Sequence, residues 1–403
     1  MKKTLRIFIT LCMAVFLLGS ITVGVSAKSY PIWIGNTQFT DANRTAGIPC
    51  GNGTATLQLP KNSKSPYTLT LENATVPCEK AFNYNGISFT SGIVIDANCE
   101  LVLLGENKIK TSDDLSFAEI LGTENLTVSG SGSLNTYAIR AFGDLQWKGN
   151  GIISLGRIIC TENVTMDHQN KFTVGRINAD SFTMNSGTIT RNKAGSGGGV
   201  SAYGNFTLTD GTISDNEASY GGGGVYSASY LTMEGGTISG NTAAHRGGGV
   251  YSRYLFTMKG GTISGNTATG DSSIEEGGGG VYAYSTFTMD NGTISGNMTG
   301  RDGGGVYAAA DFTMYDGEIS GNSAGTHPDS GGHGGGVCFA PSTMSYKHLY
   351  LCGGTITGNN VGESYSSGGG VWVNSSYAHV YGSVQITGNV QGGTKAAGAT
   401  VYT

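Results

Sequence analysis

Hydrophobic and polar residues alternate in short runs through most of the chain, and one pattern recurs. Its clearest copy is residues 231–252, LTMEGGTISGNTAAHRGGGVYS, which returns with small changes seven or eight times. In FTM the outer two residues are apolar, in TIS only the central Ile is apolar, and in GVYS the Val is apolar. Such period-two runs of three to five residues are typical of β-strands, and no stretch shows helical spacing. Each unit therefore predicts three short strands.

Two markers in the unit keep the same period. The Asn of the S-G-N turn recurs at steps of 24, 25, 25, 31, 25, 37 and 30 residues. The Val after the Gly run recurs with it. The longer steps contain insertions, among them TGDSSIEEGGGG and GTHPDSGGHGGG, which we expect to be loops. The Asn markers are Asn192, Asn216, Asn241, Asn266, Asn297, Asn322, Asn359 and Asn389, and the Val markers are Val200, Val225, Val250, Val281, Val306, Val337 and Val371.

A unit of about 25 residues with three strands cannot bury its apolar side chains alone, but stacked units can. Phe would then lie over Phe, Ile over Ile and Val over Val, at about 4.8 Å per coil. The predicted fold is all-β, a right-handed single-stranded parallel β-helix with three sheets. The repeated Asn is expected to stack at one bend, with each amide bonded to the next.

The pattern also divides the chain. Residues 1–27 predict a signal peptide, because Lys2, Lys3 and Arg6 precede an apolar run that ends in the small residues Val-Ser-Ala; the alternative is an uncleaved membrane anchor. Residues 28–66 are irregular and predict an N-terminal cap. Residues 67–180 predict irregular coils, and residues 181–403 predict the regular repeats.

Composition and charge narrow the function. The chain has 68 Gly among 403 residues, placed at fixed positions between apolar residues, which favours periodic structure over disorder. Without the signal peptide 20 Lys and Arg stand against 28 Asp and Glu, a net charge of about −8. An acidic surface argues against binding to nucleic acid or anionic lipid. No later run reaches the ~20 apolar residues of a membrane span, so we expect a secreted or cell-surface protein without membrane insertion after signal cleavage.

Six cysteines follow the signal peptide, and their spacing matches no zinc pattern. Export would permit the disulfides Cys50–Cys78 and Cys338–Cys352. The alternative is that the cysteines are small buried apolar residues.

The repeat resembles a known group of proteins. The combination of GGGVY, ending at Tyr251, with ISGN, ending at Asn241, resembles the GGAI and FxxN repeats of polymorphic outer-membrane proteins and other β-helical surface adhesins, with Ile here in place of Phe. The segment that begins PIWIGNTQFTDAN is similar to the opening of exported β-helix proteins of gut bacteria, often labelled carbohydrate-binding. The resemblance implies an adhesin-like surface role and no catalytic residues.

An enzyme is the alternative function. Parallel β-helices host polysaccharide lyases and glycoside hydrolases, which need two or three clustered carboxylates. The position after FTM carries instead a mixed column, namely Asn185, Thr209, Glu234, Lys259, Asp290 and Tyr315. We therefore expect no catalytic residues and no cofactor.

Two further patterns have polar chemistry. The insertions hold acids and histidines, but their spacing matches no cation site, so we expect solvated loops; these residues are Asp271, Glu275, Glu276, His327, Asp329 and His333. Ranks of Thr and Ser on the TIS strands resemble ice-binding surfaces. Four of six second positions are Ser without the methyl group, which disfavours that function.

An aromatic column is the candidate binding site. The residue after the inward-facing Val points outward by alternation, and it is predicted to be exposed. Tyr faces with a hydroxyl at the rim suit sugar rings or a protein partner, so the expected ligand is a glycan or a protein on a host or neighbouring cell. Two alternatives remain: the rings only stabilise their own sheet, or the protein is a plain spacer. The candidate contacts are Tyr226, Tyr251, Tyr282, Tyr307 and Trp372, with Tyr203, Tyr230, Tyr254 and Tyr284 nearby.

Overall fold

The structure is a computed structural model of the chain. It describes residues 27–402, apart from 79, 85, 111–119, 175–176, 271–276, 327–330, 342–346, 363–365, 375–376, 393 and 396–400. The predicted signal peptide therefore lies outside the described residues, except for its last residue. The same holds for the insertion residues Asp271, Glu275, Glu276, His327 and Asp329.

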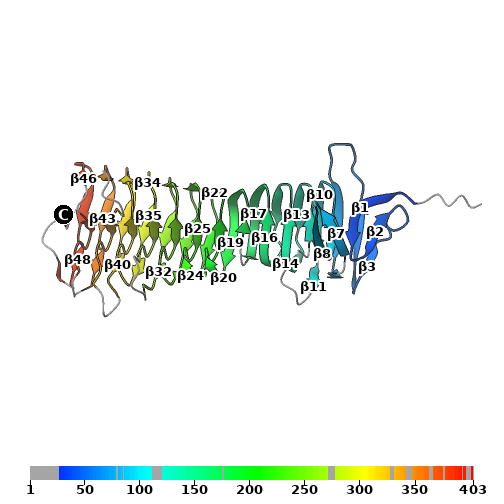
Figure 1. Cartoon of the computed structure of the whole chain (residues 1–403), viewed down its shortest axis with the longest axis horizontal. Helices are drawn as coiled ribbons and strands as arrows, with labels where there is room; N and C mark the ends of the chain where they lie inside the picture. The colour runs from blue at the N-terminus through cyan, green and yellow to red at the C-terminus, as the bar shows by residue number, and fades with distance from the viewer. Residues whose placement is uncertain are drawn as a thin grey trace, which may run out of the picture.

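The protein is all-β, and long stacks of parallel strands run along an elongated body (Figure 1). In the repeat region the strands lie across the long axis, and nearly all of them pair with the equivalent strand of the next repeat. Among the described residues, there is no helix with the length and hydrophobicity to cross a membrane.

The N-terminal strands pair differently from the rest. β1 pairs antiparallel with β2, β3 with β4, and β4 with β5, where Thr54 lies opposite Glu72. This antiparallel layer occupies the edge of the first parallel strand, so that edge has no free backbone groups to offer another chain. The four N-terminal strands are β1 (Ser29–Ile34), β2 (Thr37–Thr40), β3 (Ile48–Cys50) and β4 (Gly53–Gln58).

Longer and less regular strands follow, and most of them pair in parallel, as β10 does with both β5 and β13. β7 and β8 form a separate antiparallel hairpin. The strands are β5 (Tyr67–Glu72), β6 (Thr75–Pro77), β7 (Lys80–Tyr84), β8 (Ile87–Ser91), β9 (Ile93–Ile95), β10 (Cys99–Leu104), β11 (Glu106–Lys110), β12 (Ile120–Gly122), β13 (Leu126–Gly130), β14 (Ser133–Ala141), β15 (Leu145–Gly149), β16 (Ile153–Cys160), β17 (Asn163–Val174), β18 (Ile177–Asn178) and β19 (Ser181–Thr190).

Each regular repeat contributes strands to four stacks, named here after their sequences. The FTM stack is β22 (Asn205–Leu208), β26 (Leu231–Met233), β30 (Phe256–Met258), β34 (Phe287–Met289), β38 (Phe312–Met314), β42 (His348–Leu351) and β46 (Tyr377–Val380). The TIS stack is β23 (Thr212–Ser214), β27 (Thr237–Ser239), β31 (Thr262–Ser264), β35 (Thr293–Ser295), β39 (Glu318–Ser320), β43 (Thr355–Thr357) and β47 (Gln385–Thr387).

The other two stacks lie on either side of the glycine run. The Thr-Ala stack is β20 (Lys193–Ser196), β24 (Glu217–Gly221), β28 (Thr242–Ala243), β32 (Thr267–Ala268), β36 (Met298–Thr299), β40 (Ser323–Ala324), β44 (Asn360–Val361), β48 (Val390–Gln391) and β49 (Thr394–Lys395). The Val-Tyr stack is β21 (Val200–Ala202), β25 (Val225–Ser227), β29 (Val250–Ser252), β33 (Val281–Ala283), β37 (Val306–Ala308), β41 (Val337–Phe339), β45 (Val371–Val373) and β50 (Val401–Tyr402). The prediction of three strands per unit was wrong, because most strands of the Thr-Ala stack are too short for alternation to reveal.

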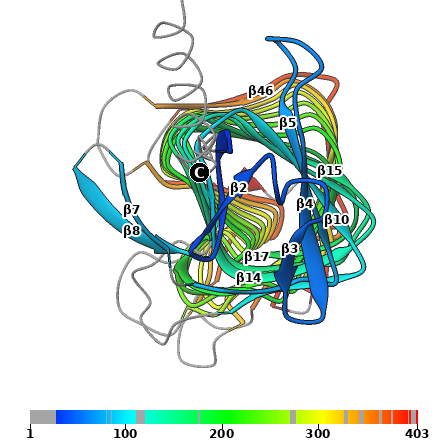
Figure 2. The same cartoon turned by 90° about the vertical axis from the view of Figure 1, so that its right-hand side faces the viewer.

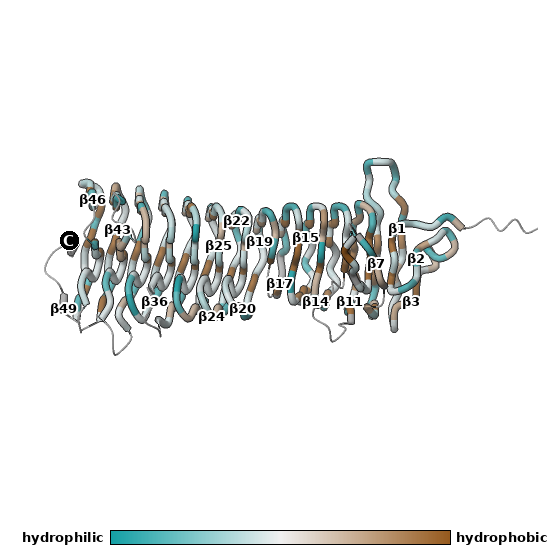
Figure 3. Tube along the Cα trace, viewed as in Figure 1, coloured by the Kyte–Doolittle hydropathy of each residue, from teal (hydrophilic) through white to brown (hydrophobic). Residues whose placement is uncertain are grey.

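Seen from its end, the molecule has the strands of successive repeats lying over one another (Figure 2). One cluster of buried hydrophobic residues runs through the body from Tyr30 to Ile386. Phe287 stacks between Phe256 and Phe312, with ring centroids 4.6 Å and 4.9 Å apart and planes within 11°. Figure 3 shows hydrophobic residues recurring at matching places in successive repeats. The predicted stacking of like on like is confirmed, because parallel in-register strands place equivalent side chains one repeat apart.

The predicted asparagine ladder is also confirmed. The side chain of Asn241 donates from Nδ2 to Oδ1 of Asn266 over 2.9 Å and to the carbonyl oxygen of Ile213 over 2.9 Å. Its backbone N–H donates to the same Oδ1 of Asn266 over 3.0 Å. The same side-chain bond joins consecutive members from Asn192 to Asn389 at 2.9–3.0 Å. Every amide is buried and satisfied, so the ladder ties neighbouring repeats together at this bend.

Candidate ligand-binding groove

The predicted aromatic residues do lie in one column. Parallel pairing of the Val-Tyr stack places Tyr251 opposite Tyr226 and Tyr282, and Tyr307 opposite Tyr282. Trp372 continues the column one repeat beyond Cys338. These side chains pack into a cluster separate from the main interior, because alternation directs them away from the inward-facing Val residues.

The predicted exposure of this column was wrong. Tyr251, Tyr282 and Tyr307 are only 5%, 1% and 6% exposed, and Tyr226 and Trp372 are half-buried. Their rings pack on each other: Tyr282 and Tyr307 are parallel to within 4° with centroids 4.8 Å apart, and Tyr251 meets Tyr282 edge-on at 5.3 Å. These three rings are therefore not a solvent-facing surface.

The chain just before each glycine run covers the rings. Arg246 pairs in parallel with Gly221 and with Gly277, and Gly277 pairs with Asp302, so these positions form their own backbone ladder. The glycine run then folds the chain back into the next strand of the Val-Tyr stack. A side chain at Gly277 would lie 2.9 Å from the Tyr307 ring. We call this the covering ladder; its members are Gly221, Arg246, Gly277, Asp302, His333 and Ser367.

Arg246 makes the most contacts of this ladder. Its guanidinium lies 5.2 Å from the Tyr282 ring centroid and 5.9 Å from that of Tyr220, within range of cation–π attraction. Nη1 donates a hydrogen bond of 3.2 Å to the Tyr220 hydroxyl. Burial raises the pKa of Tyr251, and the neighbouring Arg246 partly opposes that rise. Arg246 thus holds both the buried column and the exposed ring of Tyr220.

Toward the C-terminus, polar residues of the covering ladder pack against the same column. The ring of His333 stacks on Trp372 with centroids 4.4 Å apart, and Nδ1 lies 3.0 Å from the Ser367 hydroxyl. The backbone N–H of His333 donates to Oδ1 of Asp302 over 2.8 Å. Burial raises the pKa of Asp302, although the nearby His333 partly opposes the rise, and burial raises the pKa of Cys338 well above its usual value. Because Asp302 bonds to the backbone of His333, we interpret these contacts as structural: they hold the covering ladder against the column.

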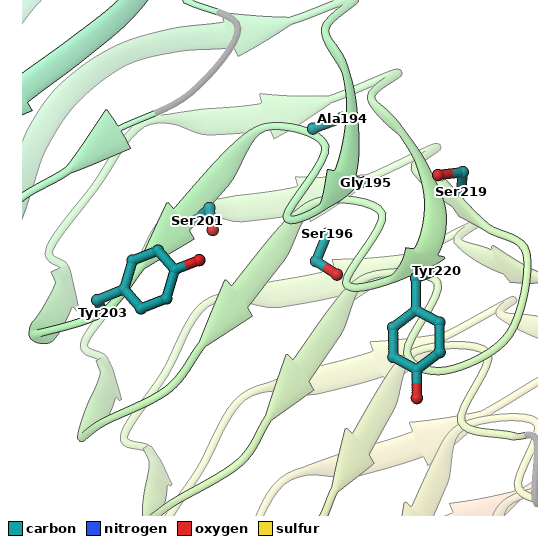
Figure 4. A pocket seen from close by; sticks show the side chains of 7 residues that line it. All are labelled: Ala194, Gly195, Ser196, Ser201, Tyr203, Ser219 and Tyr220. Atoms are coloured by element: carbon teal, nitrogen blue, oxygen red, sulfur yellow. The ribbon is translucent and has the colours of Figure 1, made fainter.

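At the N-terminal end of the column, no aromatic ring occupies the column position. Ser201 occupies the column position that Tyr226 occupies in the next repeat, and Ser196 lies opposite Gly221. Small side chains in both places leave a hollow of about 360 Å³ (Figure 4). Tyr203 and Tyr220 stand on its two sides and are 54% and 42% exposed. Its lining residues are Ala194, Gly195, Ser196, Ser201, Tyr203, Ser219 and Tyr220.

The lining of the hollow is uncharged and hydroxyl-rich. Ser196, Ser201 and Ser219 supply hydroxyl groups that can donate and accept, and the two tyrosines supply rings with hydroxyls at their edges. The volume is at the small end of pockets that hold small-molecule ligands. The sequence pattern did contain a signal for this site, because VSA at residues 200–202 departs from the VYS and VYA of the following repeats.

Exposed tyrosines continue from the hollow along the bend between the Val-Tyr and FTM stacks. Four successive repeats each contribute one, namely Tyr203, Tyr230, Tyr254 and Tyr284, which are 46–54% exposed. Tyr230 meets Tyr254 edge-on at 5.1 Å. The solvent-facing aromatic surface therefore lies beside the predicted column, at residues that sequence analysis noted only as neighbours.

The described part of the chain contains neither a disulfide nor a group of metal ligands. No disulfide joins its six cysteines, so the bonds Cys50–Cys78 and Cys338–Cys352 are absent from this structure. Cys78 and Cys352 are half-buried and the other four are buried. Within the same residues, no three His, Cys, Asp or Glu side chains form a group that could hold a metal ion.

Comparison with known proteins adds no relative. No family model matches the chain, and no curated protein or solved structure has significant similarity to it.

Proposed function

We propose that this chain is an exported binding module of the adhesin type, secreted or displayed at a cell surface, that recognises glycans. We further propose that its four strand stacks close into a right-handed single-stranded parallel β-helix of three sheets, in which the FTM and TIS stacks form one sheet because β19 pairs with both β22 and β23. Such a body would hold a binding surface rigidly away from its point of attachment.

The observation that carries the proposal is the vacant position at Ser201. In the next four repeats a tyrosine ring fills this column position, whereas Ser201 is a small buried residue that lies at the base of a hollow. Sugar rings have apolar faces that pack on aromatic rings and hydroxyl edges that form hydrogen bonds. Tyr203 and Tyr220 offer the first kind of contact, and the accessible hydroxyls of Ser196 and Ser219 offer the second.

The proposal moves the contact site away from the predicted column. Tyr251, Tyr282 and Tyr307 are covered, so their role is to stabilise the sheet and the covering ladder. The exposed tyrosines of the bend extend from the hollow along the long axis, which would allow a polysaccharide chain to contact several repeats. Repeated weak contacts of this kind raise the overall avidity.

The test is a glycan-array binding assay on residues 28–403. Replacing Ser201 by Tyr extends the ring column into the hollow, so the Ser201→Tyr variant is expected to lose glycan binding while its circular dichroism stays unchanged. Tyr203→Ser and Tyr220→Ser should each weaken binding by about tenfold, the loss of one aromatic contact of roughly 1 kcal/mol or slightly more.

Tyr254→Ser is the matched control, because Tyr254 is equally exposed but lies outside the hollow. It should weaken binding to a long polysaccharide and leave binding to a single sugar unchanged. Binding that survives Ser201→Tyr would place the glycan elsewhere. No glycan bound by the unmodified chain would favour a protein partner or a spacer role.

A further inference from the structure

The outer face of the FTM stack changes from Thr to aromatic residues in its last two strands, β42 and β46. Earlier repeats present Thr at the centre of each strand, as at Thr288 and Thr313. In β42 and β46 the equivalent positions are Tyr350 and His379, whose rings lie 4.8 Å apart with planes within 14°. An aromatic patch thus begins where the regular repeat sequence ends.

The neighbouring column on this face has a gap. Strand register and backbone hydrogen bonds place Tyr315, Cys352 and Tyr381 one above another in three successive repeats. Tyr315 and Tyr381 are 57% and 51% exposed, and the small Cys352 lies between them. The three residues, with Thr313 and Tyr350, line an open hollow of about 500 Å³.

The spacing of this gap matches a ring. Elsewhere in the protein, rings in adjacent repeats stack at 4.8–4.9 Å, as in Tyr282–Tyr307 and Phe287–Phe312. Tyr315 and Tyr381 belong to positions two repeats apart, which is about 10 Å. One further planar ring between them would therefore sit at the ordinary stacking distance from both.

The side wall of the hollow is held in place. His348 and His379 share a hydrogen bond of 3.1 Å between Nδ1 and Nε2, and the His348 backbone N–H donates to Asp311 over 2.8 Å. The ring of His348 also packs on Tyr350 at 5.4 Å. Tyr350, which lines one side of the hollow, is thus held by rings on two neighbouring residues.

We propose that the hollow over Cys352 is a binding site for a planar aromatic ring, which intercalates between Tyr315 and Tyr381. The site is separate from the glycan hollow and does not rest on it. A tyrosine on each side of a gap one repeat wide favours a planar aromatic ring over a puckered sugar, because a flat ring can stack on both. The ring can come from a small molecule or from the side chain of a peptide, and the experiment distinguishes these.

Protection of the Cys352 thiol measures occupancy. Residues 28–403 are alkylated with iodoacetamide in the presence of indole, the peptide Gly-Gly-Trp-Gly-Gly, cyclohexanol or glucose, and each cysteine is quantified by peptide mass spectrometry. Indole should slow alkylation of Cys352 several-fold, with no change at the half-buried Cys78. If the peptide protects Cys352 at a lower concentration than indole does, the ligand is a peptide side chain. If indole protects at the lower concentration, the ligand is a small molecule.

Two variants test the geometry by equilibrium dialysis with indole. Cys352→Tyr completes the ring column and should abolish binding, whereas Cys352→Ser preserves the gap and should bind as before. Tyr381→Ala removes one of the two rings beside the gap and should weaken indole binding several-fold. Because Tyr381 is exposed, this variant tests the proposal even if Cys352→Tyr fails to fold. Equal protection by cyclohexanol or glucose, or binding unchanged by Tyr381→Ala, would overturn the proposal.

Discussion

The buried asparagine at the bend recurs in all eight regular repeats. Its carboxamide both donates and accepts, so a single side chain bonds to the repeat on either side and to a carbonyl of the preceding bend. No apolar residue could do this, and a Ser or Thr hydroxyl is too short to span the same groups. The recurrence of Asn thus has a specific physical cause.

Replacing Asn266 by Ala should lower the free energy of unfolding by about 3 kcal/mol or more, because buried donors and acceptors lose their partners. The backbone N–H and Nδ2 of Asn241 would lose their acceptor, and the carbonyl of Ile238 would lose its donor. Urea denaturation followed by circular dichroism measures the change. Ser264→Ala, a half-exposed control in the same repeat, should change stability by about 0.5 kcal/mol or less. Equal losses in the two variants would contradict the role of the ladder.

At the scale of the element, the glycine run determines how the Val-Tyr strand of each repeat is covered. It lets the chain turn sharply so that the residue before it lies against the rings of the Val-Tyr stack. The glycines also lie against the glycines of the next repeat. Gly249 donates to the Gly280 carbonyl oxygen over 3.1 Å, so there is no room for a side chain between the two runs.

The two kinds of glycine in the repeat should respond differently to Ala. At Gly249 a Cβ would lie 2.7 Å from the Gly280 carbonyl oxygen and 3.0 Å from Asn266, and the backbone cannot yield easily. Gly249→Ala should therefore cost about 3 kcal/mol. Gly265 has φ +62° with its nearest neighbour 4.0 Å away, so Gly265→Ala should cost only the left-handed penalty of about 1 kcal/mol. The comparison is made by thermal melts of both variants. A larger loss at Gly265 would show that conformation, not space, makes these glycines necessary.

The glycine run also explains what the sequence could and could not predict. Alternation correctly placed Tyr251 and Tyr282 in one column outside the main interior, because it depends only on the strand itself. It could not predict their burial, which depends on Arg246 and Gly277 folding over the column from the preceding stack. The hollow at Ser201 was missed for the same reason: an empty position is significant only once the cover over its neighbours is known.

At the scale of the whole molecule, each repeat contacts the repeats before and after it and few others. Stability in such proteins is close to a sum of repeat and interface contributions. The insertion at residues 271–276 leaves the register of the flanking strands unchanged, because β29 still pairs with β33 and β32 with β36 across it. The stack of repeats should therefore tolerate the removal or addition of a whole repeat.

Deletion of residues 242–266 should give a folded protein. The cut joins Asn241 to Thr267, so each of the four stacks loses one strand and the asparagine ladder stays continuous. Small-angle scattering should report a body shorter by about 5 Å with the circular dichroism per residue unchanged. The matched control deletes residues 242–253, which removes half a repeat and brings unlike strands together; it should fail to fold. If the two deletions behave alike, the repeat is not the unit of folding.

The direction of the bonds between repeats has a mechanical consequence. Strands lie across the body, so the hydrogen bonds between them and those of the asparagine ladder point along its length (Figure 1). Tension applied to the two ends acts on these interfaces in series, and each carries the full force. The weakest interface therefore sets the load at which the molecule yields, and it then lengthens by releasing one repeat after another. A tether of this kind would absorb a sudden pull gradually while the remaining repeats kept their shape.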